Sequence, residues 1–276
     1  MNAPALETDL LVATEVARSR PGESLHTAAD WLVREEPLEI RVRGKSIAVT
    51  MRTPGHDAEL ACGFLVSEGI LKQRADVVEV AHCETGEAAN LGNVINVFVA
   101  PTLPVNFDEL TRHVFASSSC GLCGKASIES VHQHFPPIEN APPVQAEVLR
   151  SLPEKLIPEQ TAFSKTGGVH AAALFNLKGD LLVLREDVGR HNAVDKVLGW
   201  AFLSQNLPLQ ETILLVSGRA SFEIMQKSLA AGIPIVAAVS APSSLAVEFA
   251  QESGQTLVGF LRGGTFNLYA GAQSLQ

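Results

Sequence analysis

Short apolar strands that alternate with helices in the last third of the chain constrain its fold most strongly. Residues 212–216, 233–239 and 256–260 are predicted strands, because each is a nearly continuous run of apolar residues. Residues 221–231 and 243–253, which lie between them, have helical patterns. Apolar strands joined by helices form a parallel sheet that is covered on both faces. The C-terminal part is therefore predicted to have an α/β fold.

A predicted hairpin precedes these strands, so the expected sheet is not purely parallel. Residues 171–177 and 181–184 are two apolar runs joined by Lys178-Gly179-Asp180, which is typical of antiparallel strands. A helix is predicted over 192–203, where apolar residues lie on one face. The second part of the chain is therefore expected to hold a mixed sheet with helices on both faces.

The first half of the chain has an α+β pattern. Residues 38–42 and 47–51 alternate between polar and apolar on either side of a glycine turn, as the strands of a hairpin do. Asp57 is predicted to cap a helix that ends near residue 67. Strands are expected at 77–80 and 94–99, and a second helix is expected to begin near residue 124.

Changes in composition divide the chain into four predicted parts. The first residues are weakly patterned, with a loop at 18–22. Prolines crowd between residues 136 and 160, where they cannot all lie inside regular elements, although a short helix is allowed around 146–152. The predicted parts are an N-terminal extension (1–33), a smaller α+β domain (34–135), a Pro-rich linker (136–160) and an α/β domain (161–276).

Composition excludes several classes of protein. The chain has 276 residues, 46% hydrophobic and 18% charged, which supports a folded core rather than disorder. A net charge of −9 and an aromatic content of 5% argue against a nucleic-acid coat or a stacking platform for single strands. The start has no basic region typical of a signal peptide, and the longest apolar run, 229–239, is too short for a membrane span. We therefore expect a cytoplasmic protein without nucleic-acid or membrane partners.

Small polar residues and arginines follow the three predicted parallel strands. The three segments are 217–221, 240–244 and 261–265, and two of them hold an arginine. Open α/β sheets bind ligands beyond the carboxyl ends of their strands. Helix starts attract anions there, and an arginine matches a phosphate bidentately. One such segment is ordinary turn chemistry, but three together favour a ligand that carries phosphate.

A dense polar stretch runs from Asp187 to Asn192 and leads from a strand into a helix. His191 is a candidate acid or base, because its ordinary pKa is near neutrality. The structural alternative, which spacing alone favours, is a helix start capped by Asn192, with an Asp187–Arg190 pair holding the turn.

Cys120 and Cys123 form a CxxC motif among serines and glycines, just ahead of the predicted helix. A helix start and the nearby Lys125 both favour the thiolate, which is the reactive form. A zinc site would need two more ligands at a recognisable spacing, and the chain has no second CxxC. The deaminase signature of H-x-E and P-C-x-x-C is also missing. A catalytic redox pair or a sulfur-carrying pair remains, and no resident metal is expected.

These motifs together resemble the formate dehydrogenase accessory sulfurtransferase family, the FdhD-type proteins. The resemblance runs from about residue 36 to residue 269, and several ordered blocks are far more specific than one CxxC. The blocks are 118–124, 186–196, 217–223, 240–244 and 259–263.

The resemblance implies a fold, a chemistry and a set of partners. The second domain would be cytidine-deaminase-like without the zinc site, and the protein would be a homodimer. It would take sulfur from a cysteine desulfurase and pass it to the metal of a molybdenum bis-pterin guanine dinucleotide cofactor, bound as cargo, before the cofactor enters formate dehydrogenase. The metal could be molybdenum or tungsten.

The resemblance also implies roles for individual residues. Cys120 would hold the persulfide, and Cys123 would assist or resolve it. His191 would be a polar contact or a proton donor. Ser217, Gly218, Arg219, Ser240 and Ser243 would line the nucleotide ends of the cofactor. The segment in direct contact with the cofactor would be Phe260, Leu261, Arg262, Gly263, Gly264 and Thr265.

Two other functions fit the same residues. A dithiol–disulfide oxidoreductase would cycle Cys120 and Cys123 between thiols and a disulfide. A non-catalytic chaperone would bind the pterin cofactor and use the cysteines only for docking. The state of the two thiols after exposure to a sulfur donor discriminates between these functions.

Overall fold

The computed structural model describes residues 10–22, 24–83, 92–107 and 135–276. Its larger sheet has six strands in the order β12-β11-β10-β9-β7-β8. Strand β7 is antiparallel to both β8 and β9, and β12 is antiparallel to β11, whereas β9, β10 and β11 are parallel. The sheet is therefore mixed, as predicted. The strands are β7 (His170–Asn176), β8 (Leu181–Asp187), β9 (Thr212–Val216), β10 (Ile235–Ala238), β11 (Thr256–Arg262) and β12 (Thr265–Ala270).

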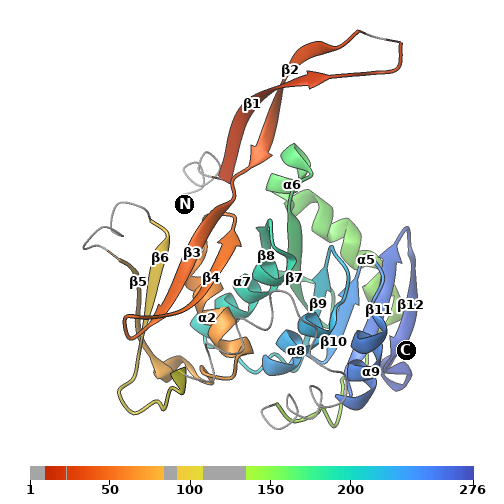
Figure 1. The fold of residues 1–276 in the computed structure, drawn as a ribbon. Coiled ribbons are helices and arrows are strands. Elements are labelled where there is room, and N and C mark those ends of the chain that lie inside the picture. The colour runs from red at the N-terminus through yellow and green to blue at the C-terminus, as the bar shows by residue number, and fades with distance from the viewer. Residues whose placement is uncertain (1–9, 23, 84–91, 108–134) are drawn as a thin grey trace.

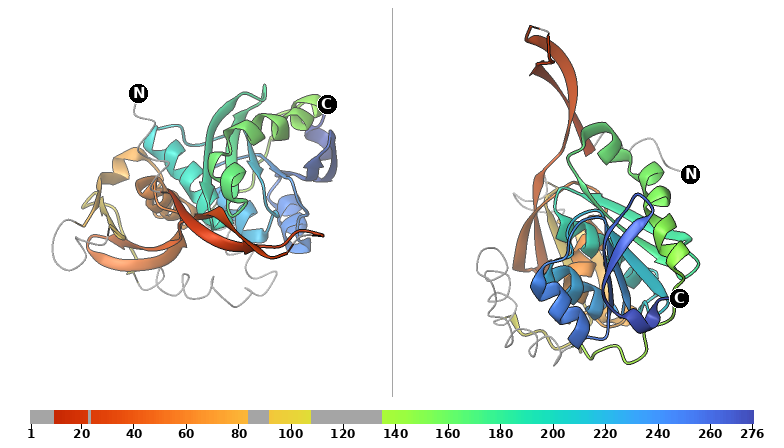
Figure 2. Two further views of the ribbon diagram at one scale, coloured as in Figure 1. Left: turned by 90° about the horizontal axis from the view of Figure 1, so that it is seen from above. Right: turned by 90° about the vertical axis from the view of Figure 1, so that its right-hand side faces the viewer.

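Helices cover both faces of this sheet, which confirms the predicted α/β class (Figure 2). Helices α7 (Arg190–Leu203), α8 (Phe222–Ala230) and α9 (Ser244–Glu252) pack on one face, where Leu214 and Val236 point. Helix α5 (Ala146–Leu156) packs on the other face, against neighbours in the same strands such as Ile213 and Ile235. Because successive side chains of a strand point to opposite faces, a strand buried on both sides must be apolar throughout.

Helix α5 confirms the short helix allowed around 146–152 and continues to Leu156, inside the segment predicted as a Pro-rich linker (136–160). Its turns include Pro153, and the short helices η3 (Ile157–Glu159) and α6 (Thr161–Thr166) follow. A proline inside a helix costs about 3 kcal/mol. Leu149, Leu152 and Leu156 lie on one face and are buried against the sheet. Each buried leucine contributes roughly 1.5–3 kcal/mol, so the packing of this stripe outweighs the cost of the proline.

A smaller four-stranded sheet, in the order β4-β3-β6-β5, forms the N-terminal half. Helix α2 (Asp57–Ser67) covers one face of it, and the short helix η1 (Arg74–Asp76) precedes β5. The predicted hairpin, helix and later strands of this part are all present. The strands are β3 (Glu36–Val42), β4 (Lys45–Arg52), β5 (Val77–His82) and β6 (Val94–Val99). The helix expected from residue 124 lies outside the described residues.

Helices α2 and α7 cross closely between the two sheets (Figure 1). A Cβ atom added to Gly63 of α2 would lie 1.7 Å from the carbonyl oxygen of Asp195, and one added to Gly199 of α7 would lie 1.7 Å from that of Glu59. Only glycine at both positions lets the two backbones come this close. Phe202 of α7 packs in the core of the smaller sheet. The two predicted domains therefore share a tightly packed boundary, although their exact limits stay a prediction.

Residues in the predicted N-terminal extension form a two-stranded antiparallel ribbon. Strand β1 (Leu11–Arg18) pairs with β2 (His26–Val33), and the ribbon projects away from the body of the protein (Figure 1). The weak pattern of this region led to no strand prediction, so these two strands were missed. Half-buried and exposed positions alternate along both strands, but the half-buried positions of β1 include Thr14 and Arg18, so the sequence lacks the apolar alternation of a half-buried strand. No helix among the described residues has the length and apolar character needed to cross a membrane.

Candidate functional site

The candidate segments of the second domain meet at one edge of the six-stranded sheet. Strands β8, β9, β10 and β11 all point the same way, so their carboxyl ends lie together. The residues that follow them are His191 after β8, Ser217, Gly218 and Arg219 after β9, and Ser240 and Ser243 after β10, while Phe260–Arg262 ends β11. We call this region the carboxyl edge. It is the place where an open α/β sheet binds ligands.

Backbone hydrogen bonds join the loops of the carboxyl edge to one another. The Ser243 N–H donates to the carbonyl of Ala220 at 3.0 Å, and the Phe260 N–H donates to the carbonyl of Ser240 at 3.0 Å. Three successive strand ends are thus held in a fixed arrangement. Loops that are separate in the sequence are therefore hydrogen-bonded neighbours at this edge.

Two of the candidate serines use their hydroxyl groups to hold the backbone. The Ser217 hydroxyl accepts a hydrogen bond from the Ala171 N–H at 2.9 Å. The Ser243 hydroxyl caps helix α9 by accepting from the Ala246 N–H at 3.2 Å. These two contacts are those of ordinary turn and cap chemistry, the alternative recognised from the sequence. Arg219 lies on the same edge and is exposed.

The third strand end differs from the prediction. Strand β11 continues to Arg262 and turns directly into β12, so no helix start follows it. Gly263 and Gly264 have φ values of 58° and 71°, in the left-handed region that glycine adopts readily. Because this turn supplies no helix N-terminus, any anion bound there would depend on Arg262 and on backbone N–H groups.

Within this turn the side chains divide between the core and the surface. Leu261 is fully buried in the apolar cluster on the α5 side of the sheet, so its side chain is not available to a ligand. Phe260 is half-buried with a φ of 52°, and the Arg262 guanidinium lies 5.6 Å from its ring centroid. Gly263, Gly264 and Thr265 are exposed, and the Thr265 hydroxyl donates to the Arg262 carbonyl at 3.1 Å.

His191 lies at the start of α7 and is neutral at physiological pH. Burial and the nearby charge of Arg190 lower the pKa of His191 to about 4. Its Nε2 atom lies 3.3 Å from the Ser221 hydroxyl and 3.9 Å from a carboxylate oxygen of Glu223. A second histidine, His170 at the start of β7, also has a pKa lowered by burial and by Arg190. The sequence analysis did not single out His170, because it lies far from the motifs along the chain.

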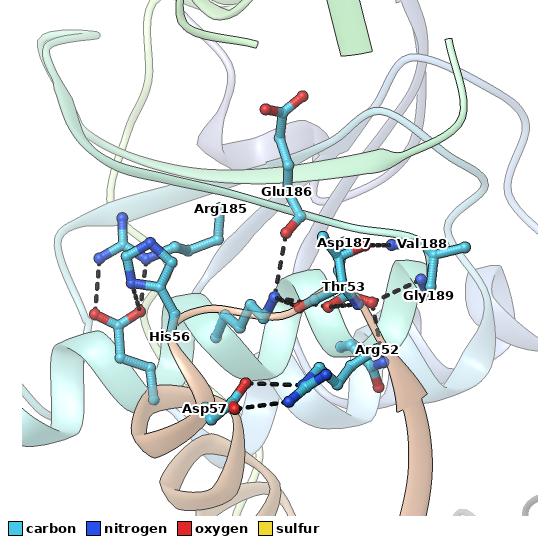
Figure 3. A network of polar contacts seen from close by, with 12 residues as sticks. Arg52, Thr53, His56, Asp57, Arg185, Glu186, Asp187, Val188 and Gly189 are labelled. Carbon is cyan, nitrogen blue, oxygen red and sulfur yellow. Dashed lines mark hydrogen bonds and ion pairs between the residues drawn. The ribbon is translucent and has the colours of Figure 1, made fainter. Parts of the chain in front are cut away.

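The polar stretch from Asp187 to Asn192 joins the two halves of the chain (Figure 3). The Asp187 carboxylate, fully buried, pairs with Lys196 at 2.7 Å and accepts from the Thr53 N–H at 3.2 Å. Lys196 also donates to the Thr53 carbonyl at 2.9 Å. The predicted Asp187–Arg190 pair was wrong, because Lys196, six residues further along α7, reaches the carboxylate instead.

Neither of the two residues predicted to cap a helix, Asn192 for α7 and Asp57 for α2, does so. Gly189 is the N-cap residue of α7, while the Asn192 side chain donates to the Met51 carbonyl at 2.7 Å and to Asp187 at 3.0 Å. His56 is the N-cap residue of α2, and Asp57 forms a two-point ion pair with Arg52, with N···O distances of 3.0 and 2.9 Å. Asn192 is drawn into a contact with a segment 141 residues away and Asp57 into an ion pair with the end of the preceding strand, and helix patterns indicate neither.

A second ion pair crosses the same boundary in Figure 3. Arg185 of β8 donates to Glu59 of α2, with an Nη2···Oε1 distance of 2.7 Å. Burial alone would raise the pKa of Glu59, but the hydrogen bonds from Arg185 and His56 outweigh it and lower the pKa. These charged residues have a structural role that the sequence analysis missed. The sequence signal that could have indicated this role is the presence of charged residues inside otherwise apolar segments.

The two cysteines predicted to carry the chemistry, Cys120 and Cys123, lie outside the described residues. Cys62 is buried in α2, and burial raises the pKa of its thiol to about 12, so it is inert as a nucleophile. Cys83 is half-buried after β5. Within the described part of the chain, no group of three or more His, Cys, Asp or Glu side chains is placed to hold a metal ion.

Comparisons with known proteins agree with the resemblance seen in the motifs. The chain is 54% identical over 263 residues to the sulfur carrier protein FdhD of Streptomyces coelicolor, covering 94% of this chain and 93% of that protein. It is 49% identical over 265 residues to the sulfur carrier protein FdhD of Mycobacterium tuberculosis, covering 94% and 96%.

Structure and family model give the same assignment. A crystal structure of a candidate formate dehydrogenase accessory protein from Desulfotalea psychrophila superposes with a TM-score of 0.75 at 26% identity, covering 97% of this chain and 100% of that one. The FdhD/NarQ family model matches residues 33–276. The chain belongs to the FdhD/NarQ family.

Proposed function

We propose that this protein is a sulfur carrier that serves formate dehydrogenase. It accepts a persulfide sulfur from a cysteine desulfurase on Cys120 and transfers that sulfur to the metal of a molybdenum bis-pterin guanine dinucleotide cofactor. The observation that carries the proposal is the similarity over nearly the whole chain to proteins named sulfur carriers, together with a CxxC motif. The homodimer, the cytoplasmic location and the cytidine-deaminase likeness stay predictions.

The first step is an exchange of sulfur between two cysteines. The Cys120 thiolate attacks the outer sulfur of the desulfurase persulfide, so a new S–S bond forms on Cys120. The S–S bond on the desulfurase breaks, and its cysteine leaves as a thiolate. No electrons are gained or lost overall. Lys125 lies close along the chain and favours the thiolate form that this attack needs.

The second step delivers the outer sulfur to the cofactor metal, which is the substrate here. The S–S bond on Cys120 breaks, Cys120 is recovered as a thiolate, and the sulfur becomes a sulfide ligand of the metal. Sulfane sulfur needs two electrons to become sulfide, and a reduced molybdenum or tungsten centre supplies them. Soft sulfur ligands suit such a transfer between a thiolate and a metal. Cys123 assists by holding or resolving the persulfide.

The carboxyl edge supports the other half of the proposal, the binding of the cofactor. The cofactor carries pyrophosphate groups, and exposed Arg219 and Arg262 stand on two loops of this edge. Arginine is suited to phosphate because its planar guanidinium donates two parallel hydrogen bonds. Gly263 and Gly264 have no side chains and no neighbouring atom within 4 Å of a Cβ position, so they leave room for a ligand at the backbone.

Mass spectrometry after incubation with a cysteine desulfurase and cysteine tests the sulfur step. Wild-type protein should gain the mass of one sulfur atom on Cys120, and Cys120→Ala should gain none and fail to activate formate dehydrogenase. Cys62 is the internal control, because its buried thiol should stay unmodified in both proteins. An internal Cys120–Cys123 disulfide would indicate the oxidoreductase, and unmodified thiols with full cofactor binding would indicate the chaperone.

A further inference from the structure

The turn between β3 and β4 holds an arginine in a backbone conformation that arginine rarely adopts. Arg43 and Gly44 are the two residues of this turn, and their φ values are 51° and 78°. Both values are positive, as a type I′ hairpin turn requires. Asparagine followed by glycine is the usual pair in such a turn, because a bulky side chain rarely adopts the left-handed region. The turn itself therefore gives no reason for an arginine at position 43.

The side chain of Arg43 supplies that reason, because it binds the backbone of the segment that follows β6. Its Nη2 atom donates to the carbonyl of Ala100 at 2.8 Å and to that of Leu103 at 2.9 Å. A third carbonyl, that of Pro101, lies 3.4 Å from the same atom. The Leu103 N–H also donates to the Ala100 carbonyl, at 3.0 Å. One guanidinium therefore holds a short stretch of backbone that lies outside any helix or strand.

The same hairpin holds the next part of this segment. Lys45 is the first residue of β4, and its Nζ atom lies 4.6 Å from the centroid of the Phe107 ring. A cation over an aromatic face is a favourable contact. Leu103, Val105 and Phe107 also pack against the apolar core of the smaller sheet. Residues 100–107 are therefore fixed to the β3–β4 hairpin and to the core beside it.

The stretch that carries the CxxC motif begins where these contacts end. Residues 108–134 lie outside the described part of the chain and follow Phe107 directly in the sequence. On their other side, Phe135 packs against the core of the larger sheet, and a Cβ atom on Gly69 would lie 3.3 Å from its ring. The two residues that flank the stretch are thus anchored, one in each core of the protein.

We propose that Arg43 is a positioning residue for sulfur transfer, because by holding residues 100–107 it fixes the point from which the CxxC-bearing stretch starts. The Cys120 thiolate must approach the outer sulfur of the desulfurase persulfide closely for the exchange to occur. A displacement of about 1 Å that begins far from the reacting atoms can slow such a step by up to about 100-fold. The inference rests on the proposed function in one respect, the role of Cys120 as the sulfur carrier. Arg43 acts through the segment that it holds.

The variant Arg43→Asn separates this role from a structural one. Asparagine is the residue that a type I′ turn prefers, so the gain at the turn offsets the lost contacts, and stability in urea should stay near that of the wild type. Persulfide formation on Cys120 is measured by mass spectrometry over a series of desulfurase concentrations. The maximal rate should fall about 10-fold, because residues 100–107 are no longer held. The half-saturating concentration of desulfurase should stay at the wild-type value.

Two variants control for the loss of a positive charge. Arg43→Lys keeps the charge, and its ammonium can donate to the same carbonyls, so it should recover part of the maximal rate. Arg150→Gln removes a charge from α5, where Arg150 pairs with Glu147, and it should take up sulfur as the wild type does. A wild-type maximal rate in Arg43→Asn, or an equal loss of rate in Arg150→Gln, would overturn the proposal.

A second variant keeps the proposal testable if Arg43→Asn fails to fold. Lys45→Gln leaves the turn unchanged and removes only the cation over the Phe107 ring. It should lower the maximal rate by about 2- to 5-fold, the factor that corresponds to one exposed cation–aromatic contact. Iodoacetamide should label Cys120 in both variants at the wild-type rate, because a small reagent needs no positioned segment. Slower labelling would show an effect on the thiol itself and would contradict positioning.

Hydrogen exchange tests the contact without any sulfur. The Leu103 amide donates to a carbonyl that Arg43 holds, so in Arg43→Asn it should exchange about 10-fold faster. Exchange at the wild-type rate would refute the holding contact. If the wild-type protein takes up no sulfur on Cys120, the proposed function fails, whereas faster exchange at Leu103 would still establish what Arg43 holds. The two failures are therefore distinguishable.

Discussion

Replacing Gly63 by alanine adds one methyl group at the crossing of helices α2 and α7. The new Cβ atom would lie 1.7 Å from the carbonyl oxygen of Asp195 and 2.8 Å from the backbone nitrogen of Gly199. An ordinary carbon–oxygen contact is about 3.5 Å, so the two backbones must separate by roughly 1.8 Å. No rotamer change relieves this clash, because both sides of it are backbone.

The direction of the change in stability distinguishes a clash between the two helices from the effect of helix propensity alone. Helix propensity alone predicts that glycine to alanine stabilises a helix interior by about 1 kcal/mol. Overpacking of a core costs typically 1–3 kcal/mol and occasionally more. Because the whole α2–α7 contact must open, we expect Gly63→Ala to lower the free energy of unfolding by about 3–5 kcal/mol.

Urea denaturation followed by circular dichroism measures this free energy. Ala58→Gly on the same helix is the control, and it should cost only about 1 kcal/mol, the helix-propensity effect. Gly199→Ala should resemble Gly63→Ala, and the double variant should cost less than the sum, because the first methyl already separates the helices. A Gly63→Ala protein as stable as the wild type, or more stable, would refute the close crossing.

Two further predictions concern buried charges at the same boundary. Lys196→Met leaves the fully buried Asp187 carboxylate without its cation and should lower the free energy of unfolding, measured in urea, by about 3–5 kcal/mol. Lys196→Met combined with Asp187→Asn should recover part of that loss. No recovery in the double variant would contradict the pairing. His191 has a pKa of about 4 in the folded protein, so its ring is neutral there. In the unfolded chain the same ring binds a proton as the pH falls below about 6.5. The contribution of the buried ring to stability is therefore complete above that pH and is lost between about pH 6.5 and pH 4. After allowance for its partial exposure, we expect wild type to lose about 1 kcal/mol more than His191→Gln between pH 7 and pH 5, and equal losses would show that the ring is not buried neutral.

Local sequence patterns were sufficient for most individual elements. Strand β9 is apolar at every position because it is buried on both faces, and that requirement is visible as a continuous run in the sequence. The β3–β4 hairpin shows alternation because one face is covered by α2. Patterns failed where half-buried positions are not apolar, as at Thr14 and Arg18 in the β1–β2 ribbon, and where packing outweighed propensity, as at Pro153 in α5.

The sequence by itself determined the family motifs, the CxxC pair and the positions of the loops that follow the parallel strands, because each depends on residues close together in the chain. Only the tertiary structure decided what the charged residues in those motifs do. Asp187 proved to bind Lys196 and Thr53, whereas Arg190 is left without a carboxylate beside His170 and Gly218. Partners of this kind lie far apart in sequence, and the choice among them depends on distances and burial that arise only when the two sheets and the crossing helices pack together.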